Sequence, residues 1–128
     1  LRDLIRKFSI GINVINFKGK TCGVVDERGE IAAMYRGVPQ NDVGIRTDII
    51  DNVSKPKGIK ILIRTMAPEI IACDEIGSVE DIQAIEEAML SGVKGVFTMH
   101  GKNIEDVNAN RNIRKLVDGK IIGKIIFI

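Results

Sequence analysis

The sequence predicts an α/β fold, with a mostly parallel sheet flanked by helices, and three observations lead to this prediction. Short apolar runs alternate with segments whose apolar residues recur at helical spacing. Three of these runs end in polar side chains, as buried parallel strands do where they meet solvent. No internal repeat or low-complexity segment divides the chain, so we expect one domain over residues 1–128.

The composition is that of a globular protein and argues against several classes of function. The chain has 128 residues, is 45% hydrophobic and 28% charged, and carries a net charge of +2 without a dense basic block. Charge therefore indicates neither DNA nor an anionic membrane as a partner. Aromatic residues make up 4%, with no Trp, which disfavours a base-stacking surface for nucleic acid. No apolar stretch reaches the ~18 residues of a membrane span.

The two cysteines are expected to be reduced core residues. Cys22 and Cys73 both lie in apolar runs that we interpret as central strands, as is typical of a cytosolic protein. With no CxxC motif and a single His in the chain, a zinc site is not indicated.

The first half of the chain is expected to contain a helix, a strand and a long loop. Residues 1–8 place their apolar side chains at helical spacing, and Gly11 ends that helix. A strand is expected over residues 21–26 and a short helix over residues 27–34. Regular patterning disappears over residues 35–56, which are rich in glycine, proline and asparagine. Such a long loop is usually functional or mobile.

The second half alternates more regularly between helix and strand patterns. Residues 59–66 predict a helix that stops before Pro68, and residues 69–74 predict a buried strand. Ser78 is expected to cap a helix over residues 79–90, whose apolar side chains share one face. The remaining expected elements are a strand over 93–99, short helices over 103–107 and 110–117, and a final strand over 120–128.

The most informative motif lies at the end of the run 69–77, where the apolar strand gives way to Asp74, Glu75 and a glycine. An Asp at such a strand end can hold hydrated Mg²⁺, and a neighbouring Glu can orient or deprotonate an attacking water. The same residues could instead form only an acidic turn. In a parallel sheet the ends at 26–28 and 98–101 lie on the same edge, which favours a ligand site.

Longer segments resemble a known protein family. Residues 24–32, 35–48, 64–69, 74–77 and 98–101 closely resemble the stage III sporulation protein AA family of endospore-forming bacteria. That family is a P-loop ATPase, similar to the motor ATPases of type II and type IV secretion and of pilus assembly. The resemblance covers essentially the whole chain and implies a RecA-like P-loop NTPase fold.

The resemblance also implies a role for each polar strand end around ATP and Mg²⁺. Asp74 matches the Walker B acid, which acts on Mg²⁺, and Glu75 matches the catalytic glutamate that positions the hydrolytic water. Thr98 and His100 fall where secretion ATPases carry a polar sensor and a histidine near the γ-phosphate. The other candidates are Asp26, Glu27 and Arg28, which resemble an acidic box at the site, and Arg36, Arg46 and Arg64 as arginine fingers or intersubunit contacts.

Each of these assignments has a structural alternative. Glu27 and Arg28 could form a surface ion pair with one another. His100 could simply cap the helix that follows it. Any single arginine could be solvated or structural.

One motif of the family does not occur in these 128 residues. There is no GxxxxGK[ST] loop, because Lys20-Thr21 lacks the glycine spacing and leads into a predicted strand, whereas a P-loop opens a helix. In the family the P-loop precedes a helix similar to residues 1–6. We therefore expect a fragment that lacks the N-terminal strand and P-loop and begins just after Walker A. Such a chain should bind ATP poorly and hydrolyse it negligibly, because it lacks the phosphate cradle.

For the intact protein, the resemblance implies a Mg²⁺-dependent ATPase that forms a ring homo-oligomer, such as a hexamer, and energises a channel between mother cell and forespore. Its partners would be membrane-channel proteins of the sporulation complex, and it would be cytoplasmic or peripheral at the membrane through them. Two other hypotheses stay open. One is a catalytically inactive scaffold or nucleotide-sensing module, and the other is a DNA-dependent ATPase, which the scarcity of basic clusters and aromatics disfavours.

Overall fold

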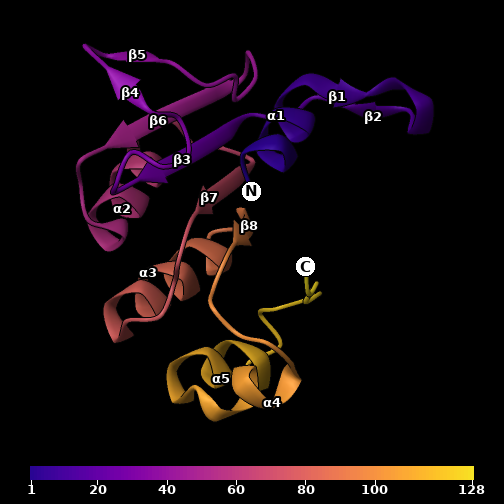
Figure 1. The fold of residues 1–128 in the computed structure, drawn as a ribbon, viewed down its shortest axis with the longest axis vertical. Helices are drawn as coiled ribbons and strands as arrows, with labels where there is room; N and C mark the ends of the chain where they lie inside the picture. Colours follow the sequence, from indigo (N-terminus) through magenta and orange to yellow (C-terminus); the bar gives the residue numbers. More distant parts are fainter.

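The computed structural model describes residues 1–128 and has a four-stranded sheet at its centre (Figure 1). The strands are β3 (Cys22–Asp26), β6 (Thr47–Asp51), β7 (Ile70–Cys73) and β8 (Lys94–Phe97), in the spatial order β6-β3-β7-β8. Every adjacent pair in this sheet is parallel. The predicted α/β fold with a mostly parallel sheet is therefore confirmed.

Helices connect β6 to β7 and β7 to β8, and two small hairpins stand outside the sheet (Figure 1). The helices are α1 (Arg2–Ile10), α2 (Lys55–Thr65), α3 (Val79–Leu90), α4 (Ile104–Ala109) and α5 (Arg111–Asp118), with a 3-10 turn η1 (Asn13–Ile15) after α1. The antiparallel hairpins pair β1 (Gly11–Ile12) with β2 (Phe17–Lys18), and β4 (Met34–Tyr35) with β5 (Val38–Pro39). None of the helices is long and apolar enough to cross a bilayer.

The core has two parts, one on each face of the sheet, because side chains alternate along each strand. Val25 and Ile71 pack with the buried residues of α2, α3, α4 and α5. Val24 and Ala72 point the other way and pack with Ile5 of α1 and with the loop after β3. Both faces are covered, which explains why the central strands read as continuous apolar runs.

A glycine allows α2 to approach the sheet closely. A Cβ atom at Gly58 would lie 2.5 Å from Cγ1 of Val25, so any larger residue there would push α2 away from β3. The close approach brings the first turn of α2 to the carboxyl end of β3, where the candidate site residues gather.

The cysteines behave as the sequence predicts. Cys22 and Cys73 are free and buried in the central strands. Burial raises the pKa of the Cys22 thiol to about 11 and that of the Cys73 thiol to about 12. Both groups therefore stay protonated at neutral pH and act as small apolar core residues.

Three sequence predictions about the elements are wrong. The expected loop over 35–56 contains β6, which pairs with β3, and the hairpin β4–β5. In place of the expected helix over 27–34, the chain forms turns and bends over 27–32 and begins β4 at Met34. The buried Asp26 carboxylate holds this loop by accepting hydrogen bonds from the N–H groups of Ile31 and Ala32. The expected strand over 120–128 has no regular structure, since no strand pairs with it.

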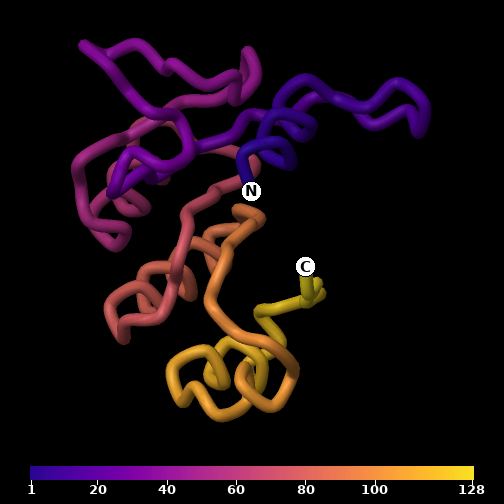
Figure 2. The backbone as a smooth tube through the Cα atoms, viewed as in Figure 1, coloured from indigo at the N-terminus to yellow at the C-terminus, as the bar shows by residue number.

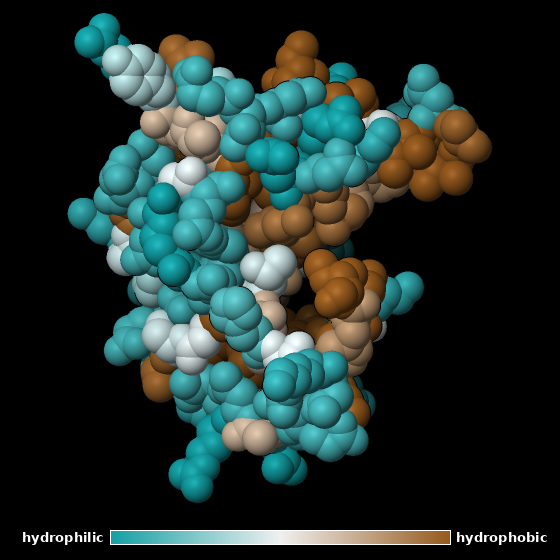
Figure 3. All heavy atoms as spheres, viewed as in Figure 1, coloured by the Kyte–Doolittle hydropathy of each residue, from teal (hydrophilic) through white to brown (hydrophobic).

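Helices α4 and α5 form a lobe that lies apart from the sheet, and we call it the α4–α5 lobe (Figure 1). After β8 the chain runs to the pair α4–α5 and then turns back toward the sheet (Figure 2). Its last residues leave large apolar side chains in solvent, with Ile126 72% exposed. Figure 3 shows exposed hydrophobic atoms in the region of this tail and on the β1–β2 hairpin, where Val14 and Ile15 are also exposed.

Candidate functional site

Polar residues from three neighbouring strands meet at one edge of the sheet. In the parallel register Val25 of β3 lies beside Cys73 of β7, which lies beside Phe97 of β8. The residues that follow each strand are therefore neighbours at the carboxyl edge, where open α/β sheets bind ligands. Seven predicted residues lie here: Asp26, Glu27, Arg28, Asp74, Glu75, Thr98 and His100.

Asp74, directly after β7, holds an unpaired polar atom. Its side chain is buried, and its Oδ1 atom has no hydrogen-bond partner. A buried carboxylate oxygen without a donor is costly, so such an atom points to a ligand that supplies the missing contact. A cation is the ligand chemistry that fits a carboxylate oxygen.

Glu75 is held from three sides. Arg28 forms an ion pair with its Oε2, and His100 Nε2 lies 3.0 Å from its Oε1. Its backbone N–H donates to Thr98 Oγ1 at 3.1 Å. The backbone of Glu75 also has a φ of 45°, in the left-handed region that a non-glycine residue rarely adopts. Six other non-glycine residues of the chain share a positive φ, so it is the contacts of Glu75 that distinguish this position.

These contacts decide two of the structural alternatives. Glu27 and Arg28 do not pair with one another, because Glu27 binds Lys55 and Arg28 binds Glu75. His100 does not cap the following helix, since the N-cap of α4 is Asn103, whose side chain accepts from the Asp106 N–H.

Glu27 forms the most buried ion pair of the site. Lys55 Nζ lies 2.7 Å from Glu27 Oε2, and Lys55 is only 7% exposed. Burial acts to lower the pKa of Lys55, but the hydrogen bond and charge of Glu27, with the charges of Asp81 and Asp74, outweigh it and raise that pKa. The ammonium group therefore stays charged.

Asp26 lies at the same edge but is turned into the protein. It is fully buried, and its two carboxylate oxygens accept from the backbone N–H groups of Ile31 and Ala32 at 2.8–3.2 Å. This geometry gives Asp26 a structural task, which is to fold the loop after β3 onto the α1 face of the sheet.

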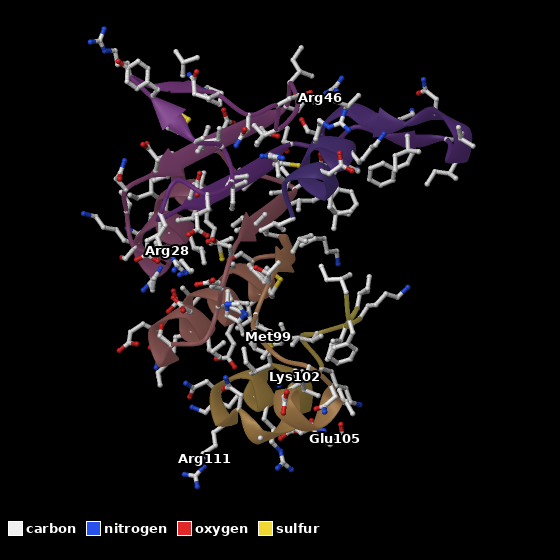
Figure 4. The ribbon with its side chains drawn as sticks, in the orientation of Figure 1. Arg28, Arg46, Met99, Lys102, Glu105 and Arg111 are labelled. Carbon is white, nitrogen blue, oxygen red and sulfur yellow. The ribbon has the colours of Figure 1, made fainter.

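The three remaining arginines lie away from this edge. Arg46 precedes β6, at the opposite end of the sheet from Arg28, and its guanidinium donates to the Ser9 carbonyl (Figure 4). Arg64 lies in the last turn of α2. Arg36 lies in the β4–β5 turn, with its guanidinium 5.3 Å from the centre of the Tyr35 ring.

A hollow of about 660 Å³ opens beside the ion pair of Glu27 and Lys55. Its lining has no hydrophobic residue and includes the first residues of α2 and α3, with Ser54, Ser78 and Asp81 among them. Lys55 is not among the predicted site residues, because it lies in the segment expected to be a loop. No motif in the sequence links Lys55 to the acidic end of the strand that contains Asp26.

The donor set can be tested against Mg²⁺. No group of three or more His, Cys, Asp or Glu side chains is arranged to hold a metal ion. Mg²⁺ does not require one, because it commonly keeps several waters and uses one or two carboxylates together with substrate phosphates. The unpaired Oδ1 of Asp74 fits that mode of binding.

Comparison with known proteins places the chain in a family. A family model described as sporulation stage III, protein AA, matches residues 1–128. The chain belongs to this family. The stage III sporulation protein AA of Bacillus subtilis (strain 168) is 40% identical over 116 residues, which cover 91% of this chain and 37% of that protein. The chain thus spans little more than a third of the length of this curated relative.

Membership of the sporulation stage III protein AA family confirms the resemblance inferred from the sequence. No solved structure matches the chain. Support for a functional site in this chain therefore comes from the geometry of the polar strand ends, above all from the neighbouring residues Asp74 and Glu75.

Proposed function

We propose that the intact protein is a Mg²⁺-dependent ATPase with a RecA-like P-loop fold, and that this chain supplies the carboxylate side of its nucleotide site. The observation that carries the proposal is the end of β7. There a buried, unpaired Asp74 oxygen adjoins a Glu75 whose carboxylate, backbone N–H and φ angle are all constrained. Sporulation is the process that the family name supports.

The two carboxylates would divide the work. Asp74 would hold Mg²⁺, mostly through water, and the ion would neutralise charge on the phosphates of ATP. Glu75 would orient the attacking water and accept its proton. Because Arg28 and His100 occupy both Glu75 oxygens, one of these contacts has to open for Glu75 to accept a proton.

The other polar residues of the edge would assist the two carboxylates. Thr98 fixes the backbone of Glu75 through its hydroxyl, so it controls where the carboxylate points. His100 is exposed, and its Nε2 contacts the Glu75 carboxylate. This position suits a group that senses the γ-phosphate. Glu27 and Arg28 contribute through the charges that they place beside Lys55 and Glu75.

The phosphate-binding loop has to come from outside these residues, since they contain no GxxxxGK[ST] motif. The 128-residue chain alone should therefore bind ATP more weakly than millimolar and show negligible turnover. Arg36 and Arg64 are exposed and remote from the carboxylate edge, which supports a role at a neighbouring subunit in a ring homo-oligomer. In such a ring the protein would energise membrane-channel proteins of the sporulation complex.

The test is the ATP hydrolysis rate of the intact protein with Asp74→Asn or Glu75→Gln. Loss of the Mg²⁺ ligand or of the general base should lower the turnover number by at least about 100-fold. Asp118→Asn makes the same chemical change on the exposed surface of α5 and should leave the rate unchanged. Wild-type hydrolysis by both site variants would remove Asp74 and Glu75 from these roles.

The alternative function is a nucleotide-independent scaffold of the same complex. The observation that favours it is the absence of a phosphate-binding loop within these residues. Light scattering after size exclusion separates the two proposals, because a scaffold ring should form without ATP and should persist in the Asp74→Asn protein. A ring that assembles only with ATP supports the motor.

A further inference from the structure

Lys55 occupies a place that is unfavourable for a lysine in two respects. It is the first residue of α2, and the partial positive charge at a helix N-terminus repels a cation. It is also 7% exposed, although lysine is almost never buried unless it is paired. A residue placed against two such rules is compensated by something nearby and is a candidate for a functional role.

The compensation comes from carboxylates of three different elements. Glu27, after β3, accepts a hydrogen bond from Lys55 Nζ at 2.7 Å. Asp74, after β7, and Asp81, in the first turn of α3, lie close enough for their charges to act on the ammonium group. Glu27 and Asp81 line the same hollow as Lys55, and Asp74 acts on the ammonium group through its charge.

The three carboxylates are not equivalent. Asp81 is satisfied, because its Oδ2 accepts from the N–H groups of Gly77 and Ser78. Asp74 keeps a buried Oδ1 without a donor. Lys55 donates to Glu27, so a cation that enters this cluster would bind at the unpaired Oδ1 of Asp74.

We propose that Lys55 is the built-in counter-ion of this carboxylate cluster, and that its ammonium group opposes the binding of a divalent cation at Asp74 until a nucleotide brings the metal in. This inference rests on the Mg²⁺ role proposed above for Asp74. Two cations at neighbouring sites repel one another, so the lysine lowers the affinity for a free divalent ion. Phosphates carry negative charge that offsets this repulsion, so the metal–nucleotide complex binds more tightly than the free metal.

This inference predicts an unusual sign for a mutation. Removing a buried, paired lysine from a purely structural position should loosen the site and weaken metal binding. If Lys55 is a competing cation, its neutralisation should instead tighten the binding of a free divalent ion. Mn²⁺ is the probe, because its solution signal in electron paramagnetic resonance disappears on binding, which gives a dissociation constant without ATP or turnover.

The experiment uses the intact protein without nucleotide and compares wild type with Lys55→Gln and Lys55→Arg. Lys55→Gln keeps a donor for Glu27 and removes the charge, so Mn²⁺ should bind about three- to tenfold more tightly. Lys55→Arg keeps the charge and should bind Mn²⁺ as wild type does. Lys115→Gln, an equal charge change at an exposed position of α5 and outside the hollow, should alter the constant less than about twofold.

Each result then has a definite meaning. An unchanged or higher dissociation constant in a cooperatively folded Lys55→Gln protein overturns the inference. If that variant does not fold, Lys55→Met is used, because it retains the apolar stem that packs in the protein. Loss of the tightening in Lys55→Gln with Asp74→Asn would confirm that Asp74 is the metal ligand. Wild-type ATP hydrolysis by Asp74→Asn would instead count against the proposed function, so the two failures are distinguishable.

Discussion

At the scale of single residues, Asp26 differs most from its sequence assignment. The resemblance suggests a residue that contacts the nucleotide site, whereas the structure shows both carboxylate oxygens bonded to the backbone of Ile31 and Ala32. These bonds replace the helix expected over 27–34 with a turn. Ile31 and Ala32 are thereby carried onto the face of the sheet that α1 covers. A buried acid at a strand end can therefore organise a loop instead of a ligand.

This arrangement predicts a large loss of stability for Asp26→Ala. Two buried N–H groups would lose their charged acceptor, so the free energy of unfolding should fall by about 2–4 kcal/mol. Urea denaturation measures this loss. Asp51→Ala is the matched control, because Asp51 pairs with Asp26 in the register of β3 and β6 but has a side-chain bond only to the exposed Asn52. A loss below about 0.5 kcal/mol for Asp26→Ala would show that the loop does not depend on this carboxylate.

Some residues of the candidate site could be predicted from the sequence, and others could not. Asp74, Glu75, Thr98 and His100 were predictable, because parallel strands bring their carboxyl ends to one edge whatever the details of packing. Lys55 was not predictable, since its place depends on β6 pairing with β3 and on Gly58 letting α2 approach the sheet. These are tertiary facts that leave no local pattern.

At the scale of elements, prediction worked where local and tertiary preferences agree. The helix over 79–90 has an apolar face and a capping residue, and α3 has these same bounds. The apolar run before Asp74 became β7 because it is buried on both faces. The run at 120–128 is equally apolar but has no strand to pair with, and β6 was missed because its polar residues resemble a loop.

The start of α3 provides a prediction at this scale. Ser78 Oγ accepts from the Asp81 N–H at 3.0 Å, and Asp81 Oδ2 accepts from the Ser78 N–H at 3.1 Å, which completes a capping box. Ser78→Ala should lower the free energy of unfolding by about 1 kcal/mol. Ser91→Ala, at the other end of α3, removes only an exposed bond to the Glu87 carbonyl and should cost less than about 0.5 kcal/mol. Equal losses in both variants would contradict a capping role.

At the scale of the whole molecule, the α4–α5 lobe looks separate from the sheet in outline but shares its hydrophobic core. In the ribbon this pair lies apart from the sheet (Figure 1). Its buried residues Val107, Ile113 and Leu116 nevertheless belong to the same cluster as Val25 and Ile71 of the central strands. A continuous apolar cluster implies that the lobe and the sheet unfold together, as expected for one domain.

Leu116→Ala tests this coupling. The side chain is completely buried, so its truncation should lower the free energy of unfolding by about 2–5 kcal/mol. Native-state hydrogen exchange should then speed up for the slowest amides of β7 and α5 by the same factor, because both open only in global unfolding. Leu90→Ala is the matched control, since Leu90 is 86% exposed at the end of α3. Faster exchange confined to α4 and α5 would mean that the lobe unfolds by itself, and that the carboxylate edge retains its structure without it.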